Sequence, residues 1–320
     1  MKKNRLPLFA LAFIAPVLLL VGLITAVTTP TAHAAPLETV ANLNDSGAGS
    51  LRQAIAAVDP GGTINFSVSG TIVLGSELVI DKNLTINGGN VITVSGNNAV
   101  RVFLVNAGTS VTLDSPTIAN GRVSGDGGGI RNNGTLTVSN SLIYSNTADF
   151  SGGGLYNTGA GKVTIAASTV ASNTAEVGGG LFNTGSGSAI ILTSGSLVQA
   201  NTASFGGGGL FNTGAGQVTI AASTVASNTA SGDGFSGGGG GGLYNTPGSA
   251  ITITNGSLVQ ANTASFGGGL RNTGAGRVVI AASTVATNTA DLFGGGIYNS
   301  GNGSAIALTN GSLVQANALT

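Results

Sequence analysis

Short segments of alternating apolar and polar residues recur along the chain, separated by turns rich in Gly and Asn. In one such segment, Val163, Ile165 and Val170 fit short strands joined by a corner, and they do not fit helical spacing. Gly-Gly and Asn-Gly pairs also recur too often for helices. The pattern predicts about three short strands in each repeat. In the first of the near-identical copies these strands are expected at 154–157, 162–167 and 168–173.

The segment 152–175 returns with few changes at 207–230 and 267–290. Its landmark, three glycines followed by an apolar residue, any residue and Asn, returns at intervals of 25 to 33 residues. A propeller blade needs about 40–45 residues, so the shorter period favours a solenoid. We therefore predict an all-β fold, a right-handed single-stranded parallel β-helix in which each repeat of about 27 residues forms one turn. The landmark Asn residues are Asn132, Asn157, Asn183, Asn212, Asn245, Asn272 and Asn299.

Stacked turns place equivalent residues directly above one another, in what we call a file. Val163, Val218 and Val278 are expected to form one interior file. The landmark Asn residues are expected to form a ladder of side-chain amides, as stacked Asn residues do in cross-β structures. Two kinds of turn alternate, one ending in AASTVASNTA and the other in GSLVQANTA, so the duplicated unit is a pair of turns.

The chain before the regular repeats divides into three parts. Residues 1–34 are predicted to be a signal peptide, 35–62 an N-terminal cap, and 63–125 less regular turns, with the regular repeats at 126–320. In the cap, Ser50 and Gln53 form a capping-box pattern, followed by apolar residues at helical spacing. This predicts a short helix that closes the open end of the solenoid.

The predicted signal peptide has a basic start, a long apolar run and small residues at Ala32 and Ala34. The apolar run is also long enough for an uncleaved membrane anchor. The proline within it and the cleavage pattern favour cleavage after Ala34, and no later segment is apolar enough to span a membrane. The mature protein is therefore expected to be secreted or held at the cell surface.

After cleavage, 8 Lys and Arg residues remain against 11 Asp and Glu, and the single His is lost. The weak negative charge argues against binding to nucleic acid. The chain contains no Cys. Disulfides, thiolate chemistry and metal sites built from His or Cys are therefore excluded for the mature chain.

Two segments resemble a known group of proteins. The stretch LNDSGAGSLRQAIAAVDPGGTINF resembles the N-terminal capping element of secreted bacterial right-handed parallel β-helix proteins with the pectin-lyase-like fold. The GGGLYN and SNTA segments are similar to the repeat of the polymorphic outer membrane protein family. The resemblance covers the chain from about Leu37 onward. It implies export and a surface or passenger role, often that of an adhesin.

One position on the GGG strand carries aromatic and Arg residues in successive repeats. Strand alternation directs these side chains outward, where aromatic rings and guanidinium groups could bind sugar rings of a polysaccharide or a cell-surface glycan. The rings could instead stack on one another or lie under loops. The candidate ligand-binding residues are Tyr156, Phe182, Phe211, Tyr244, Arg131 and Arg271. A second aromatic file is expected in the core: Phe150, Phe205, Phe235, Phe266 and Phe293.

Asp149 and Glu176 both follow an NTA segment and are expected on adjacent turns. Two stacked carboxylates could contribute to a Ca²⁺ site, although a solvated pair of loops is favoured, because two carboxylates fall short of a full oxygen shell. We expect no other cofactor or metal. No set of converging carboxylates typical of a glycoside hydrolase is visible, so no catalytic residue is assigned.

Two functions remain open from the sequence. The favoured one is a structural or adhesive surface protein that binds glycans and is not an enzyme. The alternative is a polysaccharide-active β-helix enzyme, a lyase or a glycoside hydrolase. A third idea, binding of ice by stacked Thr residues, is disfavoured because the file of Thr169, Thr224 and Thr284 is interrupted at alternate turns.

Overall fold

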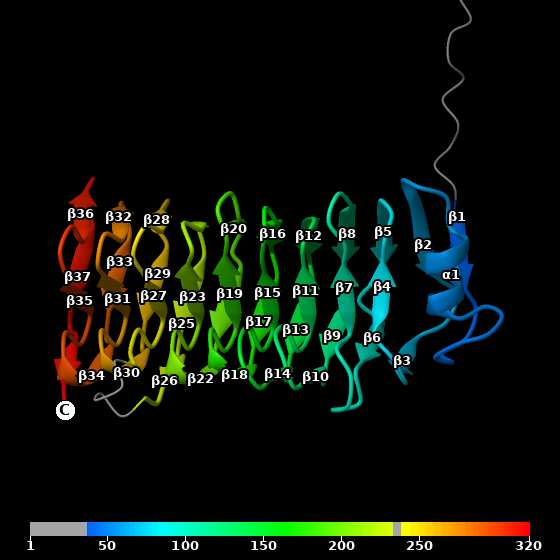
Figure 1. The fold of residues 1–320 in the computed structure, drawn as a ribbon, viewed down its shortest axis with the longest axis horizontal. Helices are drawn as coiled ribbons and strands as arrows, with labels where there is room; N and C mark the ends of the chain where they lie inside the picture. The colour runs from blue at the N-terminus through cyan, green and yellow to red at the C-terminus, as the bar shows by residue number, and fades with distance from the viewer. Residues whose placement is uncertain (1–36, 233–237) are drawn as a thin grey trace, which may run out of the picture. The chain divides into compact units, whose positions relative to one another are not determined.

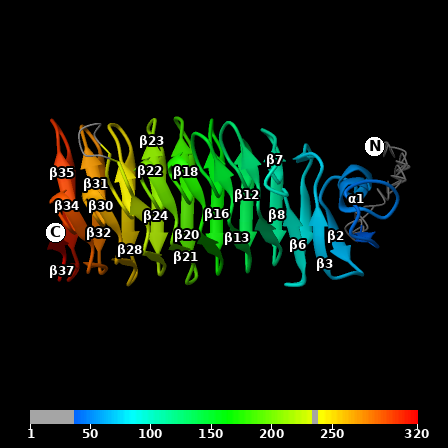
Figure 2. The same ribbon diagram turned by 90° about the horizontal axis from the view of Figure 1, so that it is seen from below.

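The computed structural model describes residues 37–232 and 238–320, which form a parallel β-solenoid with one short helix (Figure 1). The chain winds from the helix at one end to the C-terminus at the other, one stacked turn after another, as the perpendicular view also shows (Figure 2). The predicted parallel β-helix is confirmed. The predicted signal peptide, residues 1–34, lies outside the described residues.

Sheets A and B form two of the walls, and every pairing within them is parallel and in register. The strands of sheet A are β1 (Leu37–Val40), β2 (Gly62–Phe66), β5 (Leu84–Asn87), β8 (Ser110–Asp114), β12 (Thr135–Ser139), β16 (Lys162–Ala166), β20 (Ala189–Thr193), β24 (Gln217–Ala221), β28 (Ala250–Thr254), β32 (Arg277–Ala281) and β36 (Ala305–Thr309). The strands of sheet B are β3 (Gly70–Val73), β6 (Ile92–Ser95), β9 (Thr117–Ala119), β13 (Leu142–Tyr144), β17 (Thr169–Ala171), β21 (Leu197–Gln199), β25 (Thr224–Ala226), β29 (Leu258–Gln260), β33 (Thr284–Ala286) and β37 (Leu313–Gln315).

Sheets D and C complete each turn, and the GGG segment joins a D strand to the next C strand. The strands of sheet D are β10 (Arg122–Val123), β14 (Thr147–Ala148), β18 (Thr174–Val177), β22 (Thr202–Gly206), β26 (Thr229–Ala230), β30 (Thr263–Phe266), β34 (Thr289–Phe293) and β38 (Ala318–Leu319). The strands of sheet C are β4 (Leu78–Ile80), β7 (Phe103–Val105), β11 (Ile130–Asn132), β15 (Leu155–Asn157), β19 (Leu181–Thr184), β23 (Leu210–Thr213), β27 (Leu243–Asn245), β31 (Leu270–Thr273) and β35 (Ile297–Ser300).

Sheet D is the part of the turn that the sequence did not predict, since three strands per repeat were expected and the regular turns have four. In the regular turns most of its strands begin at the Thr of an NTA segment, beyond the end of the last strand predicted for each repeat. Several are only two residues long, as in β14 and β26. Such a short segment shows no alternation of its own, so its extended conformation comes from pairing with the turns above and below.

The interior is filled by aliphatic files, one or two from each sheet. Val163, Val218 and Val278 belong to one file of sheet A, with Ile190 and Ile251 between them, as the strand register shows. All five are buried. The predicted interior file is therefore confirmed, and each core residue packs against similar residues one turn above and below.

Two ladders of buried Asn side chains run along the solenoid. In the predicted ladder, the Nδ2 atoms of Asn157 and Asn183 donate to the Oδ1 atoms of Asn183 and Asn212, each at 2.8 Å. The second ladder begins each NTA segment. In it, the Nδ2 of Asn201 donates to the Oδ1 of Asn228 at 2.9 Å. Amides suit this interior position because each is both donor and acceptor, so the same residue can bond to its own copy.

We expect Asn201→Ala to destabilise the protein strongly. Asn201 is fully buried, its Oδ1 accepts from the backbone and side-chain nitrogens of Asn173, and its Nδ2 also donates to the carbonyl of Val170 at 3.0 Å. Truncation leaves these buried partners unpaired, at a cost of about 1–3 kcal/mol for each unsatisfied group. The midpoint of urea denaturation measures the effect. Gln217→Ala, at an exposed position of β24, should leave it nearly unchanged.

The predicted capping helix is present as α1 (Leu51–Ala57). The hydroxyl of Ser50 accepts from the backbone N–H of Gln53, and the Gln53 side chain accepts from the N–H of Gly49 at 3.0 Å. Leu51, Ala54 and Ile55 are buried against the first turns of the solenoid. The predicted cap region also contains β1, which pairs with β2 and forms the first strand of sheet A.

Candidate functional site

The aromatic file predicted on the GGG strands is present on the outer face of sheet C. Tyr156, Phe182 and Phe211 stack with ring centroids 5.2 and 5.3 Å apart and planes 12° and 8° from parallel. Tyr244 meets Phe211 edge-to-face at 4.8 Å. These are favourable arrangements for aromatic pairs, so each ring stabilises its neighbours.

The central rings of this file are not exposed, which corrects the predicted recognition surface. Phe182, Phe211 and Tyr244 are 8%, 9% and 8% exposed, and form a small apolar cluster outside the main core. Tyr156 is only partly buried at one edge of the cluster. Strand alternation correctly placed the rings away from the interior. It could not show that other residues cover them.

The covering residues come from the ends of the D strands. Val177 and Phe205 pack against the ring cluster from across the corner between sheets D and C. The GGG segment makes this approach possible: Gly207 has a φ of +65°, and a Cβ there would lie 2.8 Å from the Cβ of Phe211. At Gly206 a Cβ would lie 2.7 Å from the ring of Tyr244. The glycines therefore leave room for the aromatic rings.

The second aromatic file is not in the core, contrary to expectation. Phe150 and Phe293 are each 56% exposed, and Phe205 and Phe266 are partly buried. Phe235 lies outside the described residues. Each of these Phe residues lies near the end of a D strand, just before the GGG segment that leads to sheet C. Their side chains therefore lie at the outside of the corner between sheets D and C.

Both predicted Arg residues lie against aromatic rings. The guanidinium carbon of Arg131 lies 5.4 Å from the centroid of Tyr156. That of Arg271 lies 4.9 Å from Tyr244 and 5.1 Å from Phe266. Such cation–π contacts fix the orientation of the charge. Arg131 and Arg271 are both partly exposed, so each end of the buried ring cluster presents a positive group to solvent.

Asp149 and Glu176 lie on adjacent turns as predicted, because Thr147 of β14 pairs with Thr174 of β18. Both residues are exposed, and a carboxylate oxygen of Asp149 lies 3.7 Å from the guanidinium of Arg122. Across residues 37–232 and 238–320, no three Asp, Glu, His or Cys side chains gather closely enough to hold a metal ion. The Ca²⁺ site therefore stays a prediction.

Asp114, at the end of β8, has a pKa lowered from its usual value. The side chain of Asn140 and the hydroxyl of Ser139 each donate to its Oδ1 at 2.8 Å, and these hydrogen bonds outweigh the opposing effect of partial burial. They stabilise the ionised carboxylate. Their contribution to stability is present above the unfolded pKa and is lost as pH falls through the lower folded value. Because these donors lie on or beside β12, Asp114 joins successive turns of the solenoid.

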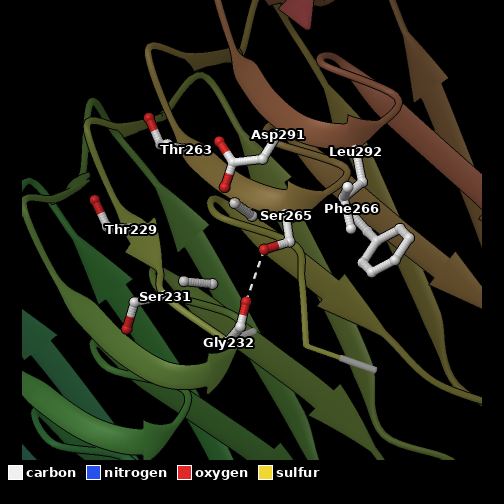
Figure 3. A pocket seen from close by; sticks show the side chains of 10 residues that line it. Thr229, Ser231, Gly232, Thr263, Ser265, Phe266, Asp291 and Leu292 are labelled. Atoms are coloured by element: carbon white, nitrogen blue, oxygen red, sulfur yellow. Dashed lines mark hydrogen bonds between the residues drawn. The ribbon is translucent and has the colours of Figure 1, made fainter. Parts of the chain in front are cut away.

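A pocket of about 720 Å³ lies on the outer side of sheet D, across β26, β30 and β34 (Figure 3). It combines hydroxyl groups, one carboxylate and aliphatic side chains. This pocket was not predicted, although Ser231, Ser265 and Asp291 follow NTA segments at the same place in successive repeats. Its lining residues are Thr229, Ala230, Ser231, Gly232, Thr263, Ala264, Ser265, Phe266, Asp291 and Leu292.

Over part of its length the chain is similar to fungal proteins named as probable pectate lyases. It is 36% identical over 152 residues to a probable pectate lyase C of Aspergillus terreus, covering 38% of this chain and 35% of that protein. A probable pectate lyase C of Aspergillus fumigatus is 33% identical over 155 residues, with the same coverage. The chain thus spans about a third of the length of these relatives. No family model matches.

Among solved structures, a crystal structure of pectate lyase Pel9A matches with a TM-score of 0.52 at 18% sequence identity, covering 89% of this chain and 78% of that one. The similarity establishes a shared pectate-lyase-like parallel β-helix fold. The resemblance to the polymorphic outer membrane protein repeat, and with it a bacterial cell surface, stays a prediction. Within the described part of the chain, no helix has the length and apolar character needed to cross a membrane.

Proposed function

We propose that this chain is a secreted, polysaccharide-active β-helix protein whose substrate is an acidic polysaccharide of the pectate class. The observation that supports this most is the 33–36% identity to proteins named as probable pectate lyases. It favours the enzyme alternative over the structural or adhesive role that the sequence analysis preferred. The shared fold of pectate lyase Pel9A supports the same choice.

The Arg residues at the ends of the ring cluster are suited to an acidic polymer. A guanidinium binds a carboxylate through two parallel hydrogen bonds, and such charge-assisted bonds are strong. Arg131 forms no ion pair with any carboxylate among the described residues, whereas Arg52, Arg101 and Arg122 do. Held over Tyr156, Arg131 is an oriented and available cation. We assign it to binding of a uronate carboxylate.

A lyase must also stabilise charge at that carboxylate. A base removes the proton from the carbon beside it, and the electron pair then forms a C=C bond and expels the glycosidic oxygen, which takes up a proton. Negative charge therefore develops on the uronate carboxylate as the first proton leaves. Preorganised cations at the carboxylate lower this barrier. Arg131 would supply part of this stabilisation.

The test is to incubate the secreted protein with polygalacturonate, with Ca²⁺ or with a chelator, and to follow the ultraviolet absorbance of the unsaturated product. Affinity electrophoresis in the same polymer measures binding. We expect binding that weakens as salt is raised. The proposal is wrong if the protein neither binds polygalacturonate nor forms unsaturated product under any of these conditions.

Arg131→Gln is expected to weaken binding to polygalacturonate about tenfold, the loss of one charge-assisted contact. Arg277→Gln is the matched control, because Arg277 is an exposed Arg at the start of β32 in sheet A, on another wall of the solenoid. Equal binding by the two variants would show that Arg131 is not part of the binding surface.

A further inference from the structure

The pocket on sheet D has a cause in the local structure. In β26, β30 and β34, Ala230 pairs with Ala264 and Ala264 pairs with Ala290. The residues that come directly after these alanines are Ser231, Ser265 and Asp291. Ser265 is only 8% exposed, and its hydroxyl donates to the carbonyl of Gly232 at 2.7 Å (Figure 3). The middle member of the file is therefore drawn inward, and the surface is hollowed there.

Asp291 is the charged group of this hollow. It is exposed, and one carboxylate oxygen accepts from the hydroxyl of Thr320 at 3.1 Å, which leaves further acceptor positions on the carboxylate for a ligand. In Figure 3 its carboxylate extends from the strand toward the side of the pocket that Thr263 and Ser265 occupy. A carboxylate can accept two hydrogen bonds at once from neighbouring hydroxyl groups of a ligand.

The remaining lining groups favour a sugar. The hydroxyls of Thr229, Ser231 and Thr263 are partly or fully exposed and can donate or accept. The exposed side chain of Leu292 and the partly exposed ring of Phe266 provide apolar surface for the C–H face of a sugar ring. A volume of about 720 Å³ falls within the usual range of small-ligand pockets.

The charge of the pocket selects among sugars. Its lining includes Asp291 and no Lys or Arg. A uronate unit here would bring a second carboxylate close to Asp291, and like charges in a partly enclosed site repel. A neutral sugar unit offers hydroxyl donors to the same carboxylate with no such repulsion.

We infer that this pocket is a second carbohydrate site, separate from the Arg131 surface, and that it binds neutral sugar units through Asp291 and the hydroxyls of β26 and β30. The inference rests on the proposed function only in taking the ligand to be a polysaccharide. The pocket prefers neutral sugars, whereas the Arg131 surface prefers uronates. One protein molecule would therefore bind acidic and neutral segments of a polysaccharide at different places.

The experiment is affinity electrophoresis of the secreted protein in galactan, arabinan and xylan as neutral polymers, and in polygalacturonate as the acidic one. Asp291→Asn keeps the shape of the side chain and an acceptor for Thr320 but removes the charge. We expect it to weaken binding to a neutral polymer about tenfold, as loss of a charge-assisted contact does. Binding to polygalacturonate should be unchanged or tighter.

Glu176→Gln is the matched control, because Glu176 is an exposed carboxylate at the equivalent place on β18 and lies outside the pocket. Thr263→Val, nearly isosteric, is a second probe that should also weaken neutral binding. Thermal melting checks that the variants fold. The inference is overturned if the wild-type protein binds none of the neutral polymers, or if Asp291→Asn binds them as well as Glu176→Gln does. If the wild-type protein binds a neutral polymer but neither binds polygalacturonate nor forms unsaturated product, the proposed function is overturned and this inference stands.

Discussion

Replacing Leu181 by Asp is expected to lower the free energy of unfolding by more than about 4 kcal/mol. Leu181 is fully buried in β19 and pairs in register with Leu155 and Leu210, which are also fully buried. An Asp there must either carry a charge into the apolar interior or take up a proton, and the buried residues within 37–232 and 238–320 include no Lys or Arg to pair with it. Urea denaturation followed by circular dichroism measures the loss.

The control is Thr174→Asp. Thr174 is an exposed residue on the outer face of β18, so a carboxylate there stays hydrated, and the denaturation midpoint should move little. The neighbouring Glu176 shows that this face already accepts a negative charge. Similar losses for Leu181→Asp and Thr174→Asp would mean that the inward and outward faces of these strands are assigned wrongly.

The double replacement of Phe182 and Phe211 by Ser is expected to cost about 4–6 kcal/mol of stability, with each large-to-small change leaving a cavity. The two rings stack on each other with centroids 5.3 Å apart and are nearly buried, under Val177 and Phe205. If the rings formed the exposed glycan-binding surface considered from the sequence, the same change would weaken glycan binding and leave the fold intact. The observed burial changes that expectation to a loss of stability, measured by thermal melting.

Phe150→Ser is the control, because Phe150 also lies at the corner between sheets D and C but is 56% exposed. Its replacement should change the melting temperature little, as surface substitutions usually do. If the double variant has the same melting temperature as Phe150→Ser but loses binding to polysaccharide, the ring cluster is a recognition surface and the structural interpretation is wrong.

Much of the fold could be predicted because the repeat is nearly exact. Copies of one segment can bury their apolar residues together only if equivalent positions stack, so Val163 and Val218 had to share a file, and Asn157 and Asn183 a ladder. The capping helix followed from Ser50 and Gln53, which act over a few neighbouring residues. These features depend on local chemistry and on identity between turns, and both are written in the sequence.

The tertiary structure alone decided what covers the outer side of each turn. Alternation along a strand separates inward from outward residues, but Phe182 and Phe211 are buried because a D strand ends against a C strand at the corner. The same is true of the pocket: Ser265 and Asp291 follow the same segment of the repeat, but Ser265 is buried and bonded to the carbonyl of Gly232, whereas Asp291 is exposed beside a shift in the register between β30 and β34. Contacts between strands at a corner depend on the path of the chain in space, which the periodicity of the sequence does not specify.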